Sequence, residues 1–345
     1  MQTQILTTDE KDIKAAAAII NNGGLVAFPT ETVYGLGANA LDADAVARIY
    51  EAKGRPSDNP MIVHIARASD IGQLTPMLSA DIVAIIDNFW PGPLTMVLKK
   101  KPGVPDRTTG GLDTVAVRMP DSKAALSLIN MAGCPIAAPS ANLSGSPSPT
   151  RAKDVIADMD GRIDAVISGE DCRVGIESTV VDMTGDVPTI LRPGIITAEN
   201  IEAAIGKKVQ YDKSLFKGAE LGSLDPAEGS QDGVDGFKPK SPGMKYKHYA
   251  PKAQMTVIEG RRDKVKSEIE RVKALNERLG LKVGVILFEE QAFIEAAHDF
   301  FSRLRDLDNE GVDLILAGAL SDKDGVGFAV MNRMLKSAGY NIAKV

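Results

Sequence analysis

The sequence predicts a two-domain α/β protein, in which a twisted mixed sheet with helices is followed by a smaller open α/β domain. Two observations predict this fold class. Apolar, β-branched runs alternate with helical segments, and some runs lie too close together for crossover connections, which indicates a mixed sheet. The alternation stops near residue 206 and resumes near residue 253. We therefore expect a first domain at 1–205, a flexible linker at 206–252 and a second domain at 253–345.

The first domain begins with a short strand at 2–7 and an alanine-rich helix at 13–20. An apolar strand at 25–28 ends at a proline, and the polar residues and glycines of 29–37 are expected to form a loop. A helix follows at 42–53, with Asp42 or Asp44 as its N-cap and Gly54 as a left-handed C-cap. The later elements are helices at 82–89, 122–132 and 151–159 and strands at 61–65, 94–98, 114–119, 165–167 and 175–182, with 189–194 closing the domain.

The second domain is expected to start with a strand near residue 255. Helices at 261–279 and 328–338, with another between them, alternate with strands at 283–288 and 312–316, which is a Rossmann-like layout. No G-x-G-x-x-G follows the first strand, so we expect no dinucleotide site there. The segment 218–236 before this domain holds five glycines, five acidic residues and no cation, which is typical of a linker.

The composition of the chain excludes some classes of function. Its 345 residues are 44% apolar and 25% charged, as in ordinary globular proteins. A net charge of -6 and a pI near 5.3 argue against binding through non-specific contacts to nucleic-acid phosphates. Cys134 and Cys172 lack metal-ligand spacing and are expected to be reduced thiols. Neither a signal segment nor a stretch of roughly 18 apolar residues is found, so we expect a cytoplasmic protein without membrane contact.

Two cations flank the end of the helix at 42–53. Lys53 and Arg55 either complement the helix dipole or face the phosphates of a ligand, with Asn59 adding directional hydrogen bonds. Two prolines, Pro56 and Pro60, hold the intervening backbone rigid, which suits a binding site better than a solvated bend.

Two of the expected strands carry a side chain that can be charged. A histidine in an apolar strand is more often a satisfied core residue, but His64 faces the side opposite Val63 and Ile65, where a pocket could lie. Arg118 ends a β-branched strand. It either forms a structural ion pair or clamps a substrate carboxylate, for which guanidinium geometry is well suited.

The segment 140–148 holds four serines, an asparagine and a glycine. It is either a surface loop or an anion cradle of hydroxyls and amides before the next helix. Ser178 and Arg192 are weak signals on their own. The histidines lack a suitable catalytic partner in the sequence, and we find no nucleophile arrangement or metal-ligand cluster. The residues alone therefore predict a protein that binds an anionic small molecule.

Four motifs occur in a fixed order: F-P-T-E-T-V-Y-G-L-G at 28–37, K-G-R-P-x-x-N-P-x-x-V-H at 53–64, P-S-A-N-x-S-G at 139–145 and I-E-S-T-V-V-D at 176–182, with R-P-G after them. They closely resemble the threonylcarbamoyl-AMP synthase family, which has the YrdC-like fold. The S-P-G-M-K-Y-K-H-Y-A-P segment at 241–251 and the second domain resemble the longer, two-domain branch of that family. The resemblance covers nearly the whole chain.

This resemblance implies that L-threonine, bicarbonate and ATP give threonylcarbamoyl-AMP and pyrophosphate, with Mg²⁺ arriving on ATP. The product would pass to a downstream transferase that modifies the adenosine beside the anticodon in tRNAs. The residues implied for L-threonine are Thr32, His64, Arg118 and Ser178. Those implied for ATP are Lys53, Arg55, Asn59, Thr114, Ala138, Ser140, Ser148, Arg192 and Tyr246. Lys53 and Ser140 are expected to be the catalytic residues, because they would stabilise charge in the transition state.

The resemblance also implies that the linker covers the pocket as a lid, and Tyr246 is the tyrosine expected to contact the ligand. We expect the second domain to position this lid or to gate release. One alternative is an RNA-binding or regulatory member of the same fold without synthase activity. Another is a carbamoyl-transfer domain like that of hydrogenase maturation proteins, but the chain has no Cys-x-x-Cys pair. Direct tRNA contact and oligomeric state are left open.

Overall fold

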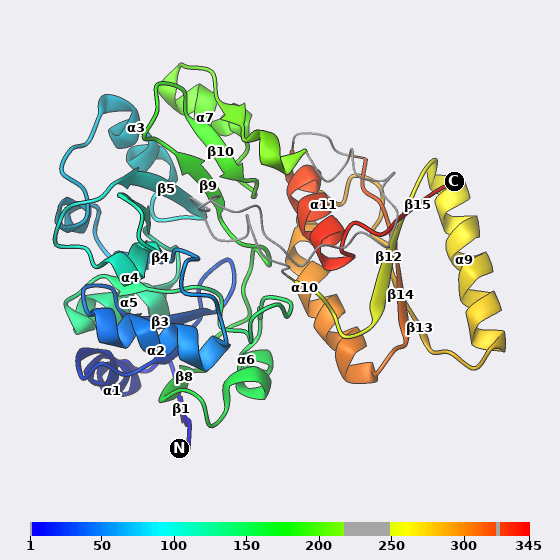
Figure 1. Cartoon of the computed structure of the whole chain (residues 1–345), viewed down its shortest axis with the longest axis horizontal. Coiled ribbons are helices and arrows are strands. Elements are labelled where there is room, and N and C mark those ends of the chain that lie inside the picture. The colour runs from blue at the N-terminus through cyan, green and yellow to red at the C-terminus, as the bar shows by residue number, and fades with distance from the viewer. Residues whose placement is uncertain (1, 217–248, 322–324) are drawn as a thin grey trace.

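The computed structural model of the chain describes residues 2–216, 249–321 and 325–345. Figure 1 shows a larger N-terminal body beside a smaller C-terminal one. Both bodies combine strands with helices, and the larger sheet is mixed, so the predicted fold class is confirmed.

The first domain is built on an 11-stranded sheet with the order β1-β8-β2-β3-β7-β4-β6-β5-β9-β10-β11. Parallel pairs such as β4 with β6 and antiparallel pairs such as β5 with β6 both occur. The strands are β1 (Gln4–Leu6), β2 (Val26–Phe28), β3 (Gly35–Asn39), β4 (Ile62–His64), β5 (Leu94–Lys99), β6 (Thr114–Arg118), β7 (Ile136–Ala137), β8 (Ala165–Ile167), β9 (Thr179–Asp182), β10 (Thr189–Arg192) and β11 (Gln210–Tyr211).

The helices of this domain follow the predicted pattern in the main. They are α1 (Glu10–Asn21), α2 (Ala43–Lys53), α3 (Ala80–Phe89), α4 (Asp106–Thr109), α5 (Lys123–Ala132), α6 (Ala152–Met159) and α7 (Ala198–Ile205), with short 3₁₀ turns η1 (Ala68–Gln73) and η2 (Lys213–Leu215). The predicted caps of α2 are confirmed. Asp42 accepts hydrogen bonds from the amides of Asp44 and Ala45, and Gly54 is left-handed with φ 61°.

The expectation that residues 29–37 form a loop is wrong at its end, because residues from Gly35 onward belong to β3. This strand pairs antiparallel with β2 and lies in the middle of the sheet. A Cβ at Gly37 would lie 2.7 Å from both Ile136 Cγ2 and Phe28 Cε1. The glycine therefore lets this strand approach its neighbours closely, and it does not mark a turn.

The strand expected at 175–182 is shorter than predicted, since β9 covers only Thr179–Asp182. Gly175 has φ +83°, which breaks an extended conformation. The residues before β9 instead contact the second domain, and a Cβ at Gly175 would lie 2.2 Å from the carbonyl oxygen of His298. Tertiary contact therefore overrides the alternating pattern here.

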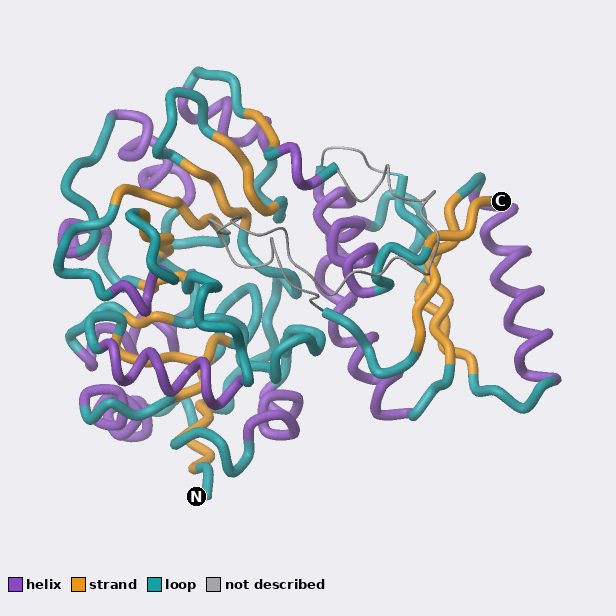
Figure 2. The backbone as a smooth tube through the Cα atoms, viewed as in Figure 1, coloured by secondary structure: helices purple, strands orange, loops and turns teal. Residues whose placement is uncertain are grey.

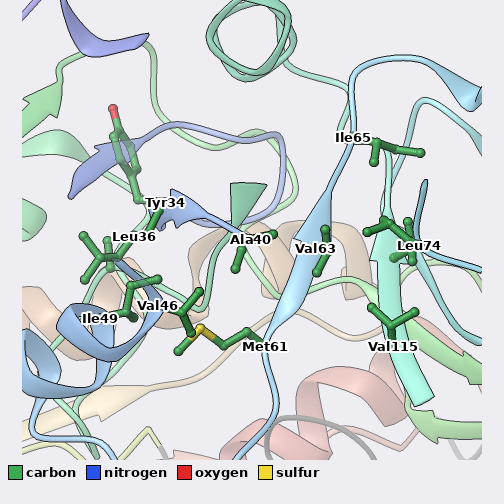
Figure 3. Close-up of a cluster of buried hydrophobic side chains, with 14 of the residues drawn as sticks. Tyr34, Leu36, Ala40, Val46, Ile49, Met61, Val63, Ile65, Leu74 and Val115 are labelled. Atoms are coloured by element: carbon green, nitrogen blue, oxygen red, sulfur yellow. The ribbon is translucent and has the colours of Figure 1, made fainter. Parts of the chain in front are cut away.

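Most apolar side chains of the first domain meet in a core under the middle of the sheet. Figure 3 shows Leu36 of β3, Ile49 of α2 and Val63 of β4 within one such cluster. All three are fully buried. Burial of this kind fixes α2 against the sheet and so fixes the position of the residues that follow α2.

The second domain is a four-stranded parallel sheet with the order β13-β14-β12-β15. Its strands are β12 (Gln254–Glu259), β13 (Val283–Ile286), β14 (Leu314–Gly318) and β15 (Ile342–Lys344), and its helices are α9 (Arg262–Arg278), α10 (Phe293–Glu310) and α11 (Val326–Ser337). In Figure 2, α10 and α11 lie between this sheet and the first domain, and α9 lies on the outer side. The final strand, β15, was not predicted.

The two domains share an apolar cluster. Val33, Val174 and Ile176 of the first domain are buried with second-domain residues such as Phe300 and Phe301. The same boundary carries buried polar contacts, which are described below. The second domain therefore packs against the first through an interface that resembles a protein core.

Candidate functional site

One pocket of the first domain gathers most of the predicted site residues. It is lined by Thr30, Thr32, Val33, Gly35, Arg55, Ile62, His64, Arg118, Ala138, Pro139, Ser140, Glu177, Arg192 and Tyr249. Seven of the predicted residues are among them: Thr32, Arg55, His64, Arg118, Ala138, Ser140 and Arg192. They come from segments that are far apart in the sequence and meet only through the sheet.

The register of the sheet places His64 and Arg118 side by side in the wall of this pocket. His64 and Arg118 are direct partners on the parallel strands β4 and β6, each at the last residue of its strand. Side chains at the carboxyl ends of neighbouring parallel strands converge, and this edge of an α/β sheet is where ligands commonly bind. Arg118 Nη1 donates to Thr32 Oγ1 at 2.9 Å, which links the third member of the predicted threonine set to the pair.

His64 is buried and neutral. Burial, aided by the neighbouring Arg118 cation, lowers its pKa to about 3. Its Nδ1 atom is buried and has no hydrogen-bond partner among the described residues. The ring stacks edge-on against Phe28, with 6.2 Å between centroids. His64 lines the pocket, and a buried ring nitrogen without a hydrogen-bond partner does not fit the interpretation of a satisfied core residue.

Arg118 is also half of an ion pair, because its Nη2 atom lies 2.7 Å from Oε2 of Glu31. Both side chains are almost fully buried, and neither of these two atoms forms a hydrogen bond with the described residues. Glu31 also lines a second cavity, together with Thr30, Ser122 and Lys123. Arg118 therefore forms a structural ion pair and also lines the pocket, so the two roles considered for it do not exclude each other.

Arg55, just after α2, lines the pocket, whereas Lys53, the last residue of α2, does not. Lys53 is buried, and its Nζ donates to the carbonyl oxygens of Ser140 and Asn142 at 2.5 Å each. Burial and the nearby Arg55 hold the pKa of Lys53 well below its usual value. Arg55 lines the pocket, and burial lowers its pKa to about 10. Its Nε atom has no partner among the residues that the structure describes, and the same is true of Asn59 Oδ1.

Ser178 and Ser148 lie just behind the pocket wall and hold residues that line it. Ser178 Oγ accepts from Arg192 Nη2 at 3.1 Å, and its carbonyl oxygen accepts from Arg192 Nε at 3.0 Å. Ser148 Oγ donates to Glu177 Oε1 at 2.7 Å. In this structure the two predicted serines therefore act on Arg192 and Glu177, and not directly on the pocket.

The remaining predicted residues are not brought to the pocket lining. Thr114 begins β6 opposite Lys99, at the end of the strand away from Arg118. Tyr246 lies outside the described residues. Tyr249, from the same motif, lines the pocket and is buried. Burial and the Glu177 carboxylate raise the pKa of Tyr249 to about 12, so the phenol is protonated at neutral pH.

Three functional candidates were missed by sequence reasoning, namely Glu31, Glu177 and Tyr249. Glu31 and Glu177 both lie inside motifs quoted above, so the motifs were the available signal. Their partners could not have been found, since Arg118 and Arg333 are 87 and 156 positions away.

Across residues 2–216, 249–321 and 325–345, no group of three His, Cys, Asp or Glu residues could hold a metal ion. In the same part of the chain no helix is long and apolar enough to cross a membrane.

Comparisons with known proteins agree with the fold. A family profile for Sua5, YciO and YrdC proteins, described as "Telomere recombination", matches residues 18–194. A second profile, "Threonylcarbamoyl-AMP synthase, C-terminal domain", matches residues 196–339. The fold, the pocket and the first profile define an α/β protein of the Sua5, YciO and YrdC class.

The full-length relatives are more specific. A threonylcarbamoyl-AMP synthase of Pyrococcus abyssi is 48% identical over 98% of this chain and 97% of its own length. One of Bacillus subtilis is 44% identical over 99% of this chain and 97% of its own. The crystal structure of P. abyssi Sua5 complexed with L-threonine superposes with a TM-score of 0.90 at 46% identity, covering 99% of this chain and 100% of the other.

The chain belongs to the threonylcarbamoyl-AMP synthase family, in its two-domain form. The predicted family is thus confirmed, and so is the predicted class of enzyme, a nucleotidyltransferase that makes an adenylate.

Proposed function

We propose that this chain condenses L-threonine, bicarbonate and ATP into threonylcarbamoyl-AMP, with release of pyrophosphate and water. The observation that carries the proposal is the charge of the pocket. Arg55, Arg118 and Arg192 line it, whereas Glu177 is the one acid among the described lining residues. Such a pocket suits a carboxylate and a polyphosphate together.

The L-threonine end is formed by Arg118, His64 and Thr32. Arg118 would hold the substrate carboxylate, since a guanidinium matches a carboxylate in shape and charge. Glu31 and Thr32 restrict the rotamer of Arg118 before the substrate arrives. Neutral His64 would offer L-threonine a hydrogen bond without adding charge. Ser178 would contribute indirectly, because it accepts a hydrogen bond from Arg192.

The ATP end is formed by Arg55, Ser140 and Arg192, with the backbone of Ala138 beside them. Lys53 and Ser140 are the proposed catalytic residues, which would stabilise charge on the phosphates in the transition state. Because Lys53 is engaged by two carbonyl oxygens of the Ser140 loop, it can reach the phosphates only if that loop shifts on binding. Asn59, Thr114, Ser148 and Tyr246 complete the proposed ATP set.

The reaction requires positioning rather than a protein nucleophile. The threonine amine attacks bicarbonate, water leaves, and an oxygen of the resulting carbamate attacks the α-phosphorus of ATP as pyrophosphate departs. Cations and amides suffice for such a displacement. Mg²⁺ would enter with the phosphates of ATP as part of the substrate, because the described residues provide no carboxylate cage for it. The product would then be used in the cytoplasm by a downstream tRNA threonylcarbamoyl transferase.

The test is pyrophosphate release from Mg–ATP, with and without L-threonine and bicarbonate, for the wild type and Arg118→Ala. We expect release to need both co-substrates. The variant should raise the KM for L-threonine by at least about 100-fold, since a charge-assisted bidentate contact is lost, while the KM for ATP changes little.

Release that does not depend on L-threonine would show instead a plain ATPase or the use of another acyl donor. Binding of ATP without any pyrophosphate release would favour the regulatory alternative. An equal rise in the KM values for L-threonine and ATP would show that Arg118 does not bind L-threonine specifically.

A further inference from the structure

Arg333 belongs to α11 of the second domain, but its guanidinium binds the first domain. Its side chain is completely buried. Nε donates to Glu177 Oε2 at 3.1 Å, and Nη2 donates to the Glu177 carbonyl oxygen at 3.3 Å. Nη1 donates to the carbonyl oxygen of Pro193. Arg333 therefore joins two first-domain segments, each of which supplies a residue to the pocket wall.

Glu177 is held in its charged form by this contact. Burial by itself would raise its pKa, but Arg333 and then Arg192 outweigh burial and keep the pKa below its usual value. Ser148 Oγ donates to the other carboxylate oxygen. The pocket thus contains a buried carboxylate anion whose strongest charge partner comes from the second domain.

Two further cations act on Glu177: Arg192, which lines the pocket, and Lys336 of α11, whose pKa burial lowers to about 7, so that its charge is only partial at neutral pH. The guanidinium of Arg192 donates two hydrogen bonds to Ser178. A buried carboxylate that loses its partner is strongly destabilised and recruits the nearest cation. Without Arg333, we expect Glu177 to recruit Arg192, which would withdraw that guanidinium from an anionic ligand.

The segment that carries Glu177 is fixed by the second domain along its length. Val174 and Ile176 are buried in the shared apolar cluster. Between them, the backbone of Gly175 packs so closely on α10 that a Cβ would lie 2.4 Å from the carbonyl oxygen of Ala297. The placement of Glu177 in the pocket wall is therefore determined by docking of the second domain.

We propose that Arg333 is a positioning residue: it holds Glu177 so that Arg192 remains available to the phosphates of ATP. The proposal rests on the proposed function, which assigns Arg192 to ATP. It gives the second domain a defined part in nucleotide binding, although this domain contributes no side chain of α9, α10 or α11 to the pocket lining.

The test compares Mg–ATP binding by titration calorimetry in the full chain. Arg333→Met should weaken binding by at least about tenfold, because Glu177 then pairs with Arg192. Glu177→Gln/Arg333→Met should bind at least about threefold more tightly than Arg333→Met, since the competing charge is gone. Arg333→Lys should keep most of the affinity. A merely structural role for Arg333 would make the double variant no better than Arg333→Met.

Arg151→Met is the matched control. Arg151 forms an ion pair with Asp306 of α10 across the same interface, at 2.7 Å, but does not line the pocket. It should leave the ATP affinity unchanged. If Arg333→Met does not fold, as judged by circular dichroism, Arg333→Gln replaces it in the same comparison.

Arg192→Met distinguishes a failure of the proposed function from a failure of the role proposed for Arg333. If Arg192→Met binds Mg–ATP normally, the assignment of Arg192 under the proposed function is wrong. If Arg192→Met is impaired but the Glu177 substitution fails to restore binding to the Arg333 variant, only the role of Arg333 is overturned.

Discussion

At the scale of single residues, the site is made from charged and titratable side chains that are buried rather than exposed. Lys53, His64 and Arg118 are each 3% exposed or less. Each has a partner fixed by the fold, or a buried polar atom left without one. Such groups are costly in a folded protein, so their concentration in and beside one pocket marks it as a candidate functional site.

His64 makes a prediction about stability and pH. Its pKa is about 3 in the folded protein, against about 6.5 when unfolded. Between these values the unfolded chain binds a proton that the folded chain does not, so the free energy of unfolding falls as the pH falls below about 6.5. From pH 7 to pH 5 this amounts to about 2 kcal/mol.

His64→Gln should remove that contribution. Urea unfolding at the two pH values measures it, and the variant should lose less stability than the wild type on acidification. Equal losses in the two proteins would show that His64 is protonated in the fold.

At the scale of elements, the bounds and the buried face of α2 are determined by residues close together in the sequence. Its N-cap, C-cap and apolar face are all visible in the sequence, and the structure agrees with each. Because the helix ends at Lys53 and Gly54 turns the chain, Arg55 arrives at the pocket. The position of β3, by contrast, depends on close contact with neighbouring strands.

Asp42→Ala tests the helix cap. Loss of the two hydrogen bonds from Asp44 N and Ala45 N should lower the free energy of unfolding by about 1 kcal/mol. Asp9 is the matched control, because it precedes α1 without a capping hydrogen bond from its side chain. Asp9→Ala should change stability by less than half as much. Similar effects of the two substitutions in urea unfolding would rule out a specific role for the cap.

Gly37→Ala tests the close approach of β3. The added methyl group meets Ile136 and Phe28 at 2.7 Å, so the strands must shift, at an expected cost of about 1–3 kcal/mol. Gly72 has open space around its Cβ position, and Gly72→Ala should be near neutral. Thermal unfolding of both variants measures this. An unchanged Tm for Gly37→Ala would mean that the sheet adapts without strain.

At the scale of the whole molecule, the two domains are joined through buried polar contacts as well as an apolar cluster. Arg305 of α10 forms a bidentate pair with Asp158, at 3.2 and 2.8 Å, and donates to the carbonyl oxygen of Pro147. Together with Arg333, it connects the second domain to segments on both sides of the pocket. We expect the two domains to unfold together.

Arg305→Met should lower the free energy of unfolding by about 2 kcal/mol, since the half-buried Asp158 then loses its charged hydrogen-bond partner. Asp158→Asn in the same chain should recover part of this loss. Arg271→Met is the control, because Arg271 and Glu268 form a more exposed pair within α9, and no measurable change is expected. Strict additivity of the two interface substitutions would show that the pair contributes little.

The sequence by itself determined the α/β class, the mixed sheet, the caps of α2 and the family. These features depend on hydrophobic period, on cap residues and on ordered motifs, all of which are local along the chain. The motifs also named most residues of the pocket, because a family's ligand contacts are concentrated in short segments.

Only the tertiary structure decided how those residues are paired. Arg118 lies 86 positions from Thr32, and Arg333 lies 156 positions from Glu177. It also decided that Gly35 and Gly37 belong to a central strand, and that the residues just before β9 pack against the second domain. The physical reason is that a buried charge or a close backbone contact is defined by its partner, and chain folding, not sequence spacing, selects that partner.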